Sequence, residues 1–236
     1  MIDDYYTAQK QKLLADFDAG MSHVRPVLAS RYGADTANMV LSEARDRYGS
    51  LIPQLPYVGG NDSPATGWLI LAAWNLAIYQ AVKAHGGTVE AVGKLLCDAA
   101  QARYHESAPL DLDDSKRRFG RFVTRMKLYL GKAPEQTYPG GWVGTFIEGD
   151  GEEFDVGIDW TECGACKFLH AHDADELAPY LCRADFVHSK VYRWGLQRTM
   201  TLAEGHEKCD FRFKPGRETA EAWPPPFLRM QAGIQP

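Results

Sequence analysis

The stretch that decides the fold reads Trp142-Val143-Gly144-Thr145-Phe146-Ile147 and, after a turn at Gly149-Asp150-Gly151, Phe154-Asp155-Val156-Gly157-Ile158-Asp159-Trp160. Its second part alternates large apolar residues with Asp and Gly. A period of two places every second side chain on the same face, which is typical of a strand with one buried side. The Gly-Asp-Gly turn favours a hairpin. Antiparallel strands are therefore predicted after residue 141.

Upstream of this hairpin the apolar period is helical. Helices are predicted from about residue 13 to 21, from 35 to 52 and from 88 onward, and Asp113 or Ser115 could cap another. The segment from Gly67 to His85 is apolar nearly all round, and Gly86-Gly87 follows it. That pattern indicates a central buried helix.

Downstream, a helical stretch is expected from about 164 to 187, a strand from 192 to 203, a loop from 204 to 207 and a last strand from 208 to 213. The predicted fold class is α+β, with a helical N-terminal layer packed on a small antiparallel sheet and its helices. The helical region covers 1–133 and the α+β region covers 134–236. The two could form one continuous domain.

Composition limits the function classes. The 236 residues are 45% hydrophobic and 24% charged, with a net charge of −5, which argues against a nucleic-acid surface. The basic residues between 116 and 127 fit the solvated face of an amphipathic helix. The apolar run from Trp68 to Val82 is too short and polar to predict a membrane span. Met1 to Tyr6 is acidic and polar, unlike a secretory signal. A cytoplasmic protein with reduced thiols is expected.

Four of the five cysteines lie in the C-terminal third, at Cys163, Cys166, Cys182 and Cys209. Such thiols can be nucleophiles, metal ligands, redox pairs or small apolar core residues. Cys163-Gly-Ala-Cys166 lacks the context of a redox motif, because two residues separate it from Trp160. A zinc site through all four cysteines is a minor alternative, so no cofactor or metal is expected.

Cys182, Asp185 and His188 follow one another at intervals of three residues. On one continuing helix they would share a side, setting a thiol, a carboxylate and an imidazole near one another. A thiolate beside an imidazole is an activated nucleophile. The competing interpretation is a buried Cys182 in an amphipathic helix, with Asp185 as a cap.

Pairing the last two strands places Leu202 opposite Cys209 and Met200 opposite Phe211. Arg198 then stands in an otherwise apolar row. A buried guanidinium needs an anionic partner. Arg198 could clamp a substrate carboxylate, or it could form a structural ion pair with a protein carboxylate.

Several short motifs in this third carry a family resemblance. They are Glu162-Cys163, Leu181-Cys182-x-x-Asp185, Leu196-x-Arg198-Thr199-x-Thr201-Leu202-Ala203-x-Gly205 and Cys209-Asp210-Phe211-Arg212-Phe213. Together they resemble the L-2-amino-thiazoline-4-carboxylic acid hydrolase family, mainly over residues 158–213.

The resemblance implies hydrolytic opening of a small sulfur–nitrogen ring that bears a carboxylate. In outline, Cys182, or a water activated by Asp185 or His188, would attack the amidine-like ring carbon, and Glu162 would protonate the leaving group. Arg198 would hold the ring carboxylate, with Thr201, Cys209 and Asp210 as further substrate-binding positions.

Two other function classes remain open. One is a non-catalytic small-molecule-binding or sensory domain that uses the same residues. The other is a zinc-stabilised binding protein. The expected partner is a small molecule with a carboxylate, without nucleic acid or membrane, and the sequence does not predict the oligomeric state.

Overall fold

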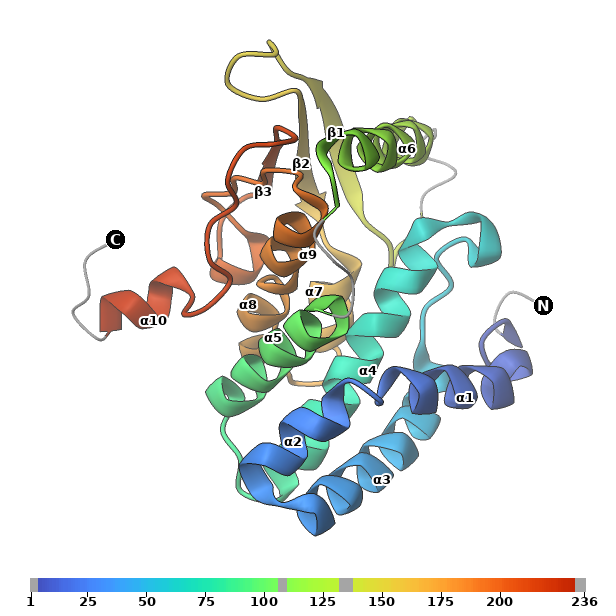
Figure 1. The fold of residues 1–236 in the computed structure, drawn as a ribbon. Coiled ribbons are helices and arrows are strands. Elements are labelled where there is room, and N and C mark those ends of the chain that lie inside the picture. The colour runs from blue at the N-terminus through green and yellow to red at the C-terminus, as the bar shows by residue number, and fades with distance from the viewer. Residues whose placement is uncertain (1–3, 106–109, 132–137, 232–236) are drawn as a thin grey trace.

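The computed structural model describes residues 4–105, 110–131 and 138–231, and Figure 1 shows their arrangement. The helices are α1 (Lys10–Gly20), α2 (Val24–Tyr32), α3 (Ala34–Leu51), α4 (Pro64–Ala84), α5 (Val89–His105), α6 (Leu112–Leu130), α7 (Gly164–His170), α8 (Ala178–Leu181), α9 (Ala184–Tyr192) and α10 (Pro226–Gln231). The strands are β1 (Val143–Glu148), β2 (Val156–Glu162) and β3 (Cys209–Phe213). The predicted α+β class is confirmed.

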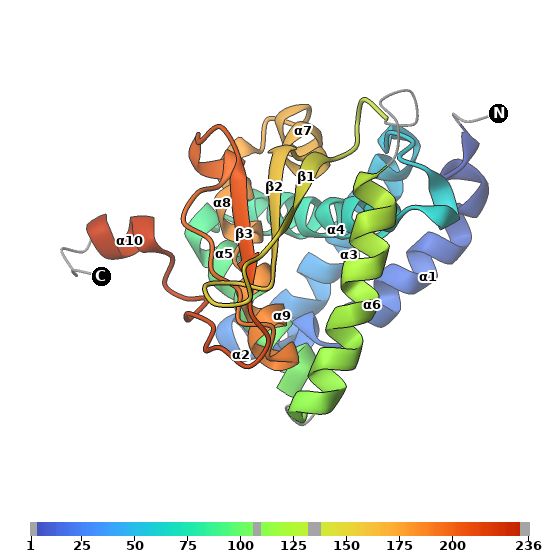
Figure 2. The same cartoon turned by 90° about the horizontal axis from the view of Figure 1, so that it is seen from above.

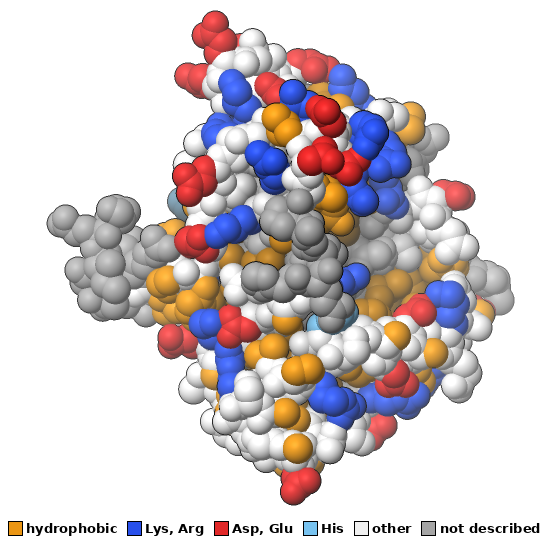
Figure 3. Space-filling view, in the orientation of Figure 1, with side chains coloured by type: hydrophobic (Ala, Val, Ile, Leu, Met, Phe, Trp, Pro, Cys, Tyr) orange, Lys and Arg blue, Asp and Glu red, His pale blue; other side chains and the backbone are white. Residues whose placement is uncertain are grey.

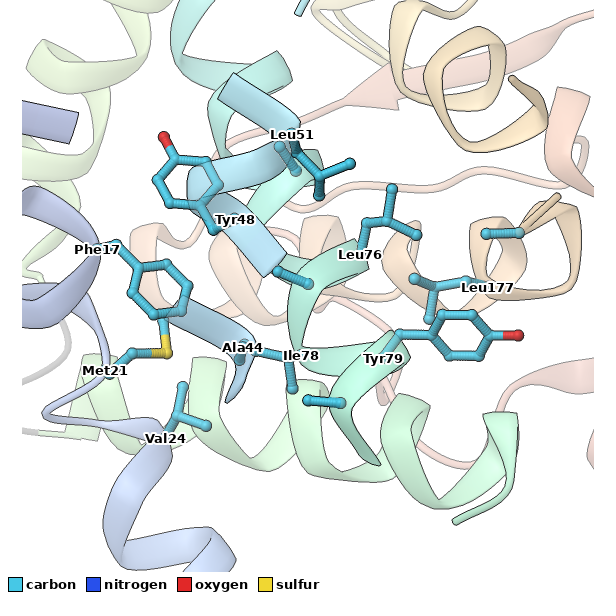
Figure 4. Close-up of a cluster of buried hydrophobic side chains, with 14 of the residues drawn as sticks. Phe17, Met21, Val24, Ala44, Tyr48, Leu51, Leu76, Ile78, Tyr79 and Leu177 are labelled. Atoms are coloured by element: carbon cyan, nitrogen blue, oxygen red, sulfur yellow. The ribbon is translucent and has the colours of Figure 1, made fainter. Parts of the chain in front are cut away.

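Helix α4 is the centre of the helical half, as its apolar sequence predicts. It packs against α3 on one side and α7 on the other. Figure 4 shows side chains of α1 and α3, including Phe17 and Tyr48, in one cluster with Leu76 of α4 and with Leu177, which lies between β2 and β3 in the chain. The main core therefore includes residues from both halves of the chain.

Helix α4 has 21 residues, more than the apolar run from Trp68 to Val82 that the sequence analysis considered. By length and composition alone it could cross a membrane. Most of its apolar window, 61%, is buried inside the protein. A core helix of a soluble protein has the same features, and the packing of α4 agrees with that assignment.

The sheet is antiparallel with the order β1-β2-β3. Ile158 of β2 lies between Phe146 of β1 and Phe211 of β3. Figure 2 shows α6 beside β1, which it contacts. Phe119 and Phe122 of α6 lie against Trp194 and Phe213, so aromatic packing joins this helix to the sheet.

Helix α6 begins one turn earlier than expected. Its cap is Asp111, whose carboxylate accepts a hydrogen bond from the Asp114 amide at 2.8 Å, so neither Asp113 nor Ser115 has that role. Ser115 is instead buried and donates to the Tyr192 carbonyl at 2.5 Å. The basic side chains of this helix are exposed, as predicted, and Figure 3 shows Lys and Arg gathered over it.

The helical stretch expected from about 164 to 187 is present, but it is divided into α7, a 3-10 turn at Asp175–Leu177, α8 and α9, so Cys182, Asp185 and His188 do not lie on one continuing helix. Asp173 adopts a left-handed conformation with φ 53°, which ends the helical path after α7. Pro179 then fits only in the first turn of a new helix, because it lacks an amide hydrogen.

The strand expected from 192 to 203 is wrong. Helix α9 continues to Tyr192, and beyond it only Gln197 forms a bridge, with Arg212 rather than with Lys214 as the predicted register requires. The register is thus two residues away from the prediction. Because a shift of two preserves the alternation of faces, Arg198 still lies on the side of Phe211.

The physical reason is the carboxylate of Asp210. It accepts hydrogen bonds from the amides of Thr199 and Met200, at 2.8 and 2.6 Å, and from the Thr199 hydroxyl at 2.6 Å. Those amides are the groups a regular ladder would pair with main-chain carbonyls of β3. A side chain therefore holds residues 199–200 in place of the predicted strand pairing.

Candidate functional site

Four cysteines, one carboxyl and one guanidinium meet where β2, β3 and the short helices come together. We call this group the cysteine cluster, and its members are Cys163, Cys166, Cys182, Asp185, Arg198 and Cys209. The charges of Asp185 and Arg198 act on the thiols of Cys182 and Cys209, and that of Asp185 also acts on Cys163. The structure thus brings together residues separated by up to 46 positions of sequence.

Cys163 lies between the end of β2 and the start of α7, where it is the N-cap residue in an extended conformation. Gly164 follows it, and a Cβ there would meet the Gly140 carbonyl oxygen at 2.4 Å and the Trp142 ring at 2.7 Å. Only a residue without a side chain allows this approach. The close packing fixes where α7 begins and where the Cys163 thiol points.

The pKa of the Cys163 thiol is lowered, first because the Cys166 side chain hydrogen-bonds to it and then because the amides of Cys166 and Ala165 lie next to it. These amide contacts are looser than a formal N-cap hydrogen bond. Burial opposes them. The free amides at a helix start stabilise negative charge, so Cys163 is the thiol of the cluster best suited to ionise.

The pKa values of the other thiols of the cluster are raised. Burial raises the pKa of Cys182, and it raises the pKa of Cys209 to about 11. Cys209 also accepts a hydrogen bond from the Leu202 amide at 3.2 Å and is buried. The nucleophilic role of Cys182 stays a prediction, and its surroundings favour the neutral thiol.

Arg198 forms the ion pair that was the alternative interpretation of this residue. Its guanidinium is 2% exposed and donates to Asp185 Oδ2 at 2.6 Å and to the Cys182 carbonyl at 2.8 Å. The rings of Phe186 and Phe211 lie at 5.0 and 4.9 Å from it. Arg198 therefore connects the α8–α9 junction to β3, while a substrate-binding role for it stays a prediction.

Asp185 is at once accessible and desolvated. Its side chain is 44% exposed, yet burial raises the pKa of its carboxyl against the opposing charge of Arg198. A small molecule can reach such a carboxyl, although protein atoms surround it. Burial favours the protonated form of this carboxyl and Arg198 favours the charged form, and a group that can exchange a proton in this way can serve as a general acid or base.

His188 and Glu162 do not join the cluster. His188 lies on α9 against the rings of Tyr192 and Trp194, at 4.4 and 5.0 Å, and burial lowers its pKa to about 4. Glu162 ends β2 and forms a surface ion pair with Lys167. Their predicted catalytic roles stay predictions that this geometry does not favour.

The side chains of Thr201 and Asp210 form hydrogen bonds with other groups of the protein. The Thr201 hydroxyl accepts from the Glu204 amide at 3.1 Å and donates to the Glu204 carboxylate at 2.7 Å, which caps the 3-10 turn Leu202–Glu204. Asp210 holds residues 199–200 as described above. Substrate binding by either residue stays a prediction, and both support the segment that carries Arg198.

Arg183 is a residue that the sequence analysis did not select. It is buried and donates to the carbonyls of Ala222 and Glu221, at 2.8 and 3.1 Å. Burial and the nearby Arg198 charge lower its pKa to about 10. In the sequence, only its position directly after Cys182 could have indicated a role at the site. The Arg183 side chain places a second positive charge beside the cluster.

Within the described residues, no three His, Cys, Asp or Glu side chains are grouped so that they could hold a metal ion. The zinc alternative thus lacks a donor set in this part of the chain, and the expectation that the protein uses no cofactor stays a prediction. A separate groove of about 410 Å³ lies between α1 and α4, with Tyr6, Trp74 and Arg103 in its wall, and it contains no residue of the cysteine cluster.

The comparison with protein families matches residues 69–213 to the L-2-amino-thiazoline-4-carboxylic acid hydrolases. This chain belongs to that family. The match covers α4 to β3 and so includes the whole cysteine cluster. Searches of curated proteins and of solved structures return no match. The family assigns a hydrolase function in general terms and supports a soluble protein.

Proposed function

We propose that the protein hydrolyses a small cyclic amidine that bears a carboxylate, similar to 2-aminothiazoline-4-carboxylate, with Cys163 as nucleophile and Asp185 as proton donor. The observation that carries the proposal is the meeting of two unlike groups in one cluster. A thiol at a helix start favours its thiolate, and a desolvated carboxyl favours its acid. Nucleophilic attack and leaving-group protonation need these two forms at the same pH.

The proposed reaction begins when the Cys163 thiolate adds to the ring carbon that bears the amino group. The electron pair of the C=N bond moves to the ring nitrogen, which receives a proton from Asp185. The adduct collapses, the ring C–N bond breaks, and the nitrogen leaves as an amine after taking up a second proton from water. A water molecule then adds to the carbon bound to Cys163 and gives up both protons, one to Asp185 and one to the hydroxide left in the solvent. The carbon–oxygen double bond forms as the Cys163 thiolate leaves. The net change adds one water across the broken bond.

Charge supports the choice of a carboxylated substrate. Arg183 and Arg198 are both buried and close enough to influence each other, while Asp185 is the carboxylate that is hydrogen-bonded to Arg198. Two guanidinium groups near one acid attract an anion into a desolvated site. In this proposal Arg198 positions Asp185 and adds its positive charge to the site without contacting the substrate.

The test is to trap the covalent intermediate. The protein is mixed with 2-aminothiazoline-4-carboxylate, quenched in acid and digested, and the peptides are weighed. The proposal expects the added mass on the peptide that contains Cys163. An adduct on the Cys182 peptide would restore the nucleophile predicted from the sequence. Turnover in water labelled with heavy oxygen, without any thiol adduct, would instead indicate direct attack by water.

A further inference from the structure

Cys163 and Cys166 occupy the two positions that define a capping box, the N-cap and the third residue of α7. Residues at these two positions are neighbours across the first turn of a helix, and here Cys163 makes no side-chain capping hydrogen bond, so its sulfur is not engaged by the main chain in that way. Both are free thiols and neither is fully buried. The two thiols interact, and Cys166 is the first cause of the lowered pKa of Cys163.

We infer that Cys163 and Cys166 form a reversible disulfide when the protein meets a small peroxide, and that this bond switches the hydrolase off. The inference rests on the proposed function, because it assumes that Cys163 is the nucleophile. It also gives Cys166 a role, since the proposed hydrolysis does not consume or protonate its thiol.

The chemistry requires one oxidant, hydrogen peroxide. The Cys163 thiolate attacks a peroxide oxygen, the O–O bond breaks, and with one proton the products are a sulfenic acid on Cys163 and water. The Cys166 sulfur then attacks the Cys163 sulfur, the S–O bond breaks, and a second water leaves. Two thiols lose two electrons and one peroxide gains them. A small dithiol reverses the bond by exchange.

Other thiols compete for the same sulfenic acid. Cys182 and Cys209 lie within electrostatic range of Cys163, so either could in principle trap it. Two features favour Cys166. It is only three residues away, so a loop of minimal length closes, and it sits on the same helix turn, whereas Cys182 and Cys209 approach from other elements. Burial also keeps those two thiols neutral.

The experiment oxidises the full-length protein with one equivalent of hydrogen peroxide and maps its peptides with trypsin. No Lys or Arg separates Cys163 from Cys166, whereas Lys167 separates both from Cys182. The expected disulfide therefore leaves one peptide two hydrogens lighter. A bond to Cys182 or Cys209 joins two peptides and overturns the inference, and so does the absence of any disulfide while Cys163 oxidises.

Two variants sharpen the test. In Cys166→Ser the sulfenic acid loses the thiol that closes the bond on the same helix turn, so dimedone should label Cys163 and the lighter peptide should disappear. Cys97→Ala is the matched control, because Cys97 is buried in α5 outside the cluster, and it should form the disulfide as the unaltered protein does. Labelling that is equally weak in the unaltered protein and in Cys166→Ser would contradict the role of Cys166.

Activity separates this inference from the proposed function. Oxidation should lower turnover more than about tenfold, and dithiothreitol should restore it. If the disulfide forms and turnover is unchanged, the nucleophile is not Cys163 and the proposed function fails. If turnover depends on Cys163 but no disulfide forms, the proposed function stands and the redox inference fails.

Discussion

The start of α7 and the junction between α8 and α9 each bring a cysteine to the same cluster, and they treat its thiol in opposite ways. At the start of α7, a neighbouring thiol and main-chain amides favour the charged form of Cys163. At the junction, burial favours the neutral form of Cys182, although Arg198 opposes this. The charge of Asp185 acts on both thiols, so the difference comes from their immediate surroundings: a neighbouring thiol and main-chain amides at Cys163, and burial at Cys182.

The largest expected effect separates the two thiols directly. Cys163→Ala should lower kcat by about a thousandfold or more, because it removes the nucleophile. Cys182→Ala should lower kcat by less than about tenfold, since that thiol is neutral and only packs beside the site. Steady-state rates on 2-aminothiazoline-4-carboxylate, with circular dichroism to verify folding, measure both. The reverse order of losses would move the nucleophile to the α8–α9 junction.

The next prediction concerns the contribution of Arg198 to the stability of the α8–α9 junction. Arg198→Met removes the partner of Asp185 and the bond to the Cys182 carbonyl, and it should lower the free energy of unfolding by roughly 2–4 kcal/mol. The lower end applies because Asp185 is 44% exposed and water can partly replace the guanidinium.

Lys190→Met is the matched control for that variant. It removes an exposed ion pair with Glu221 on the same helix α9 and should change the free energy of unfolding by less than about 0.5 kcal/mol. Urea unfolding measures both. Equal effects of the two variants would mean that Arg198 does not organise the junction.

A third prediction concerns how the stability of the protein depends on pH through His188 of α9. The fold lowers the pKa of His188 from 6.5 to about 4, so it favours the neutral ring. This contribution to stability is fully present above pH 6.5 and is lost as the pH falls toward 4, by up to about 3 kcal/mol. His188→Phe should flatten this part of the stability profile.

The comparison must be made between variant and unaltered protein at each pH. Asp185 acts with the opposite sign, because its raised pKa favours the protonated fold in acid, and the difference between the two proteins cancels it. His170→Gln is the control, since that ring is 79% exposed on α7. A similar flattening by both variants would contradict the assignment to His188.

The smallest effect tests the start of α7. Gly164→Ala forces a Cβ against the Gly140 carbonyl and the Trp142 ring, and it should destabilise the protein by about 1–3 kcal/mol and move Cys163. Gly120→Ala is the control on exposed α6, where nothing lies within 4 Å, and it should stabilise by about 0.5–1 kcal/mol. Thermal unfolding distinguishes them, and a stabilising Gly164→Ala would refute the close packing.

Much of the fold follows from short-range patterns. Alternation of large apolar residues with Asp and Gly identified β2, the turn before it identified β1 as its hairpin partner, and the apolar run of α4 identified the central helix. The grouping of Cys182, Asp185, Arg198 and Cys209 was also accessible, since a buried guanidinium requires an acid. These are cases in which a residue's own chemistry demands a particular neighbour.

The missed features depend on partners that the sequence does not specify. Cysteine is an unusual N-cap residue, so the start of α7 carried no capping signal and Cys163 remained ambiguous. The segment after Tyr192 has the alternation of a strand. Whether its amides pair with main-chain carbonyls or with Asp210 depends on tertiary geometry, which periodicity does not encode.

The carboxylate of Asp210 has a mechanical consequence for the segment that carries Arg198. Its bonds to residues 199–200 act together with the main-chain bond from the Asp210 amide to the Met200 carbonyl, at 3.4 Å, and with the bond from the Leu202 amide to Cys209 Sγ, at 3.2 Å. Gln197 also exchanges two main-chain bonds with Arg212, at 2.8 and 2.9 Å. Several bonds must therefore break together before Arg198 can move away from β3, so we expect this segment to be a rigid part of the site.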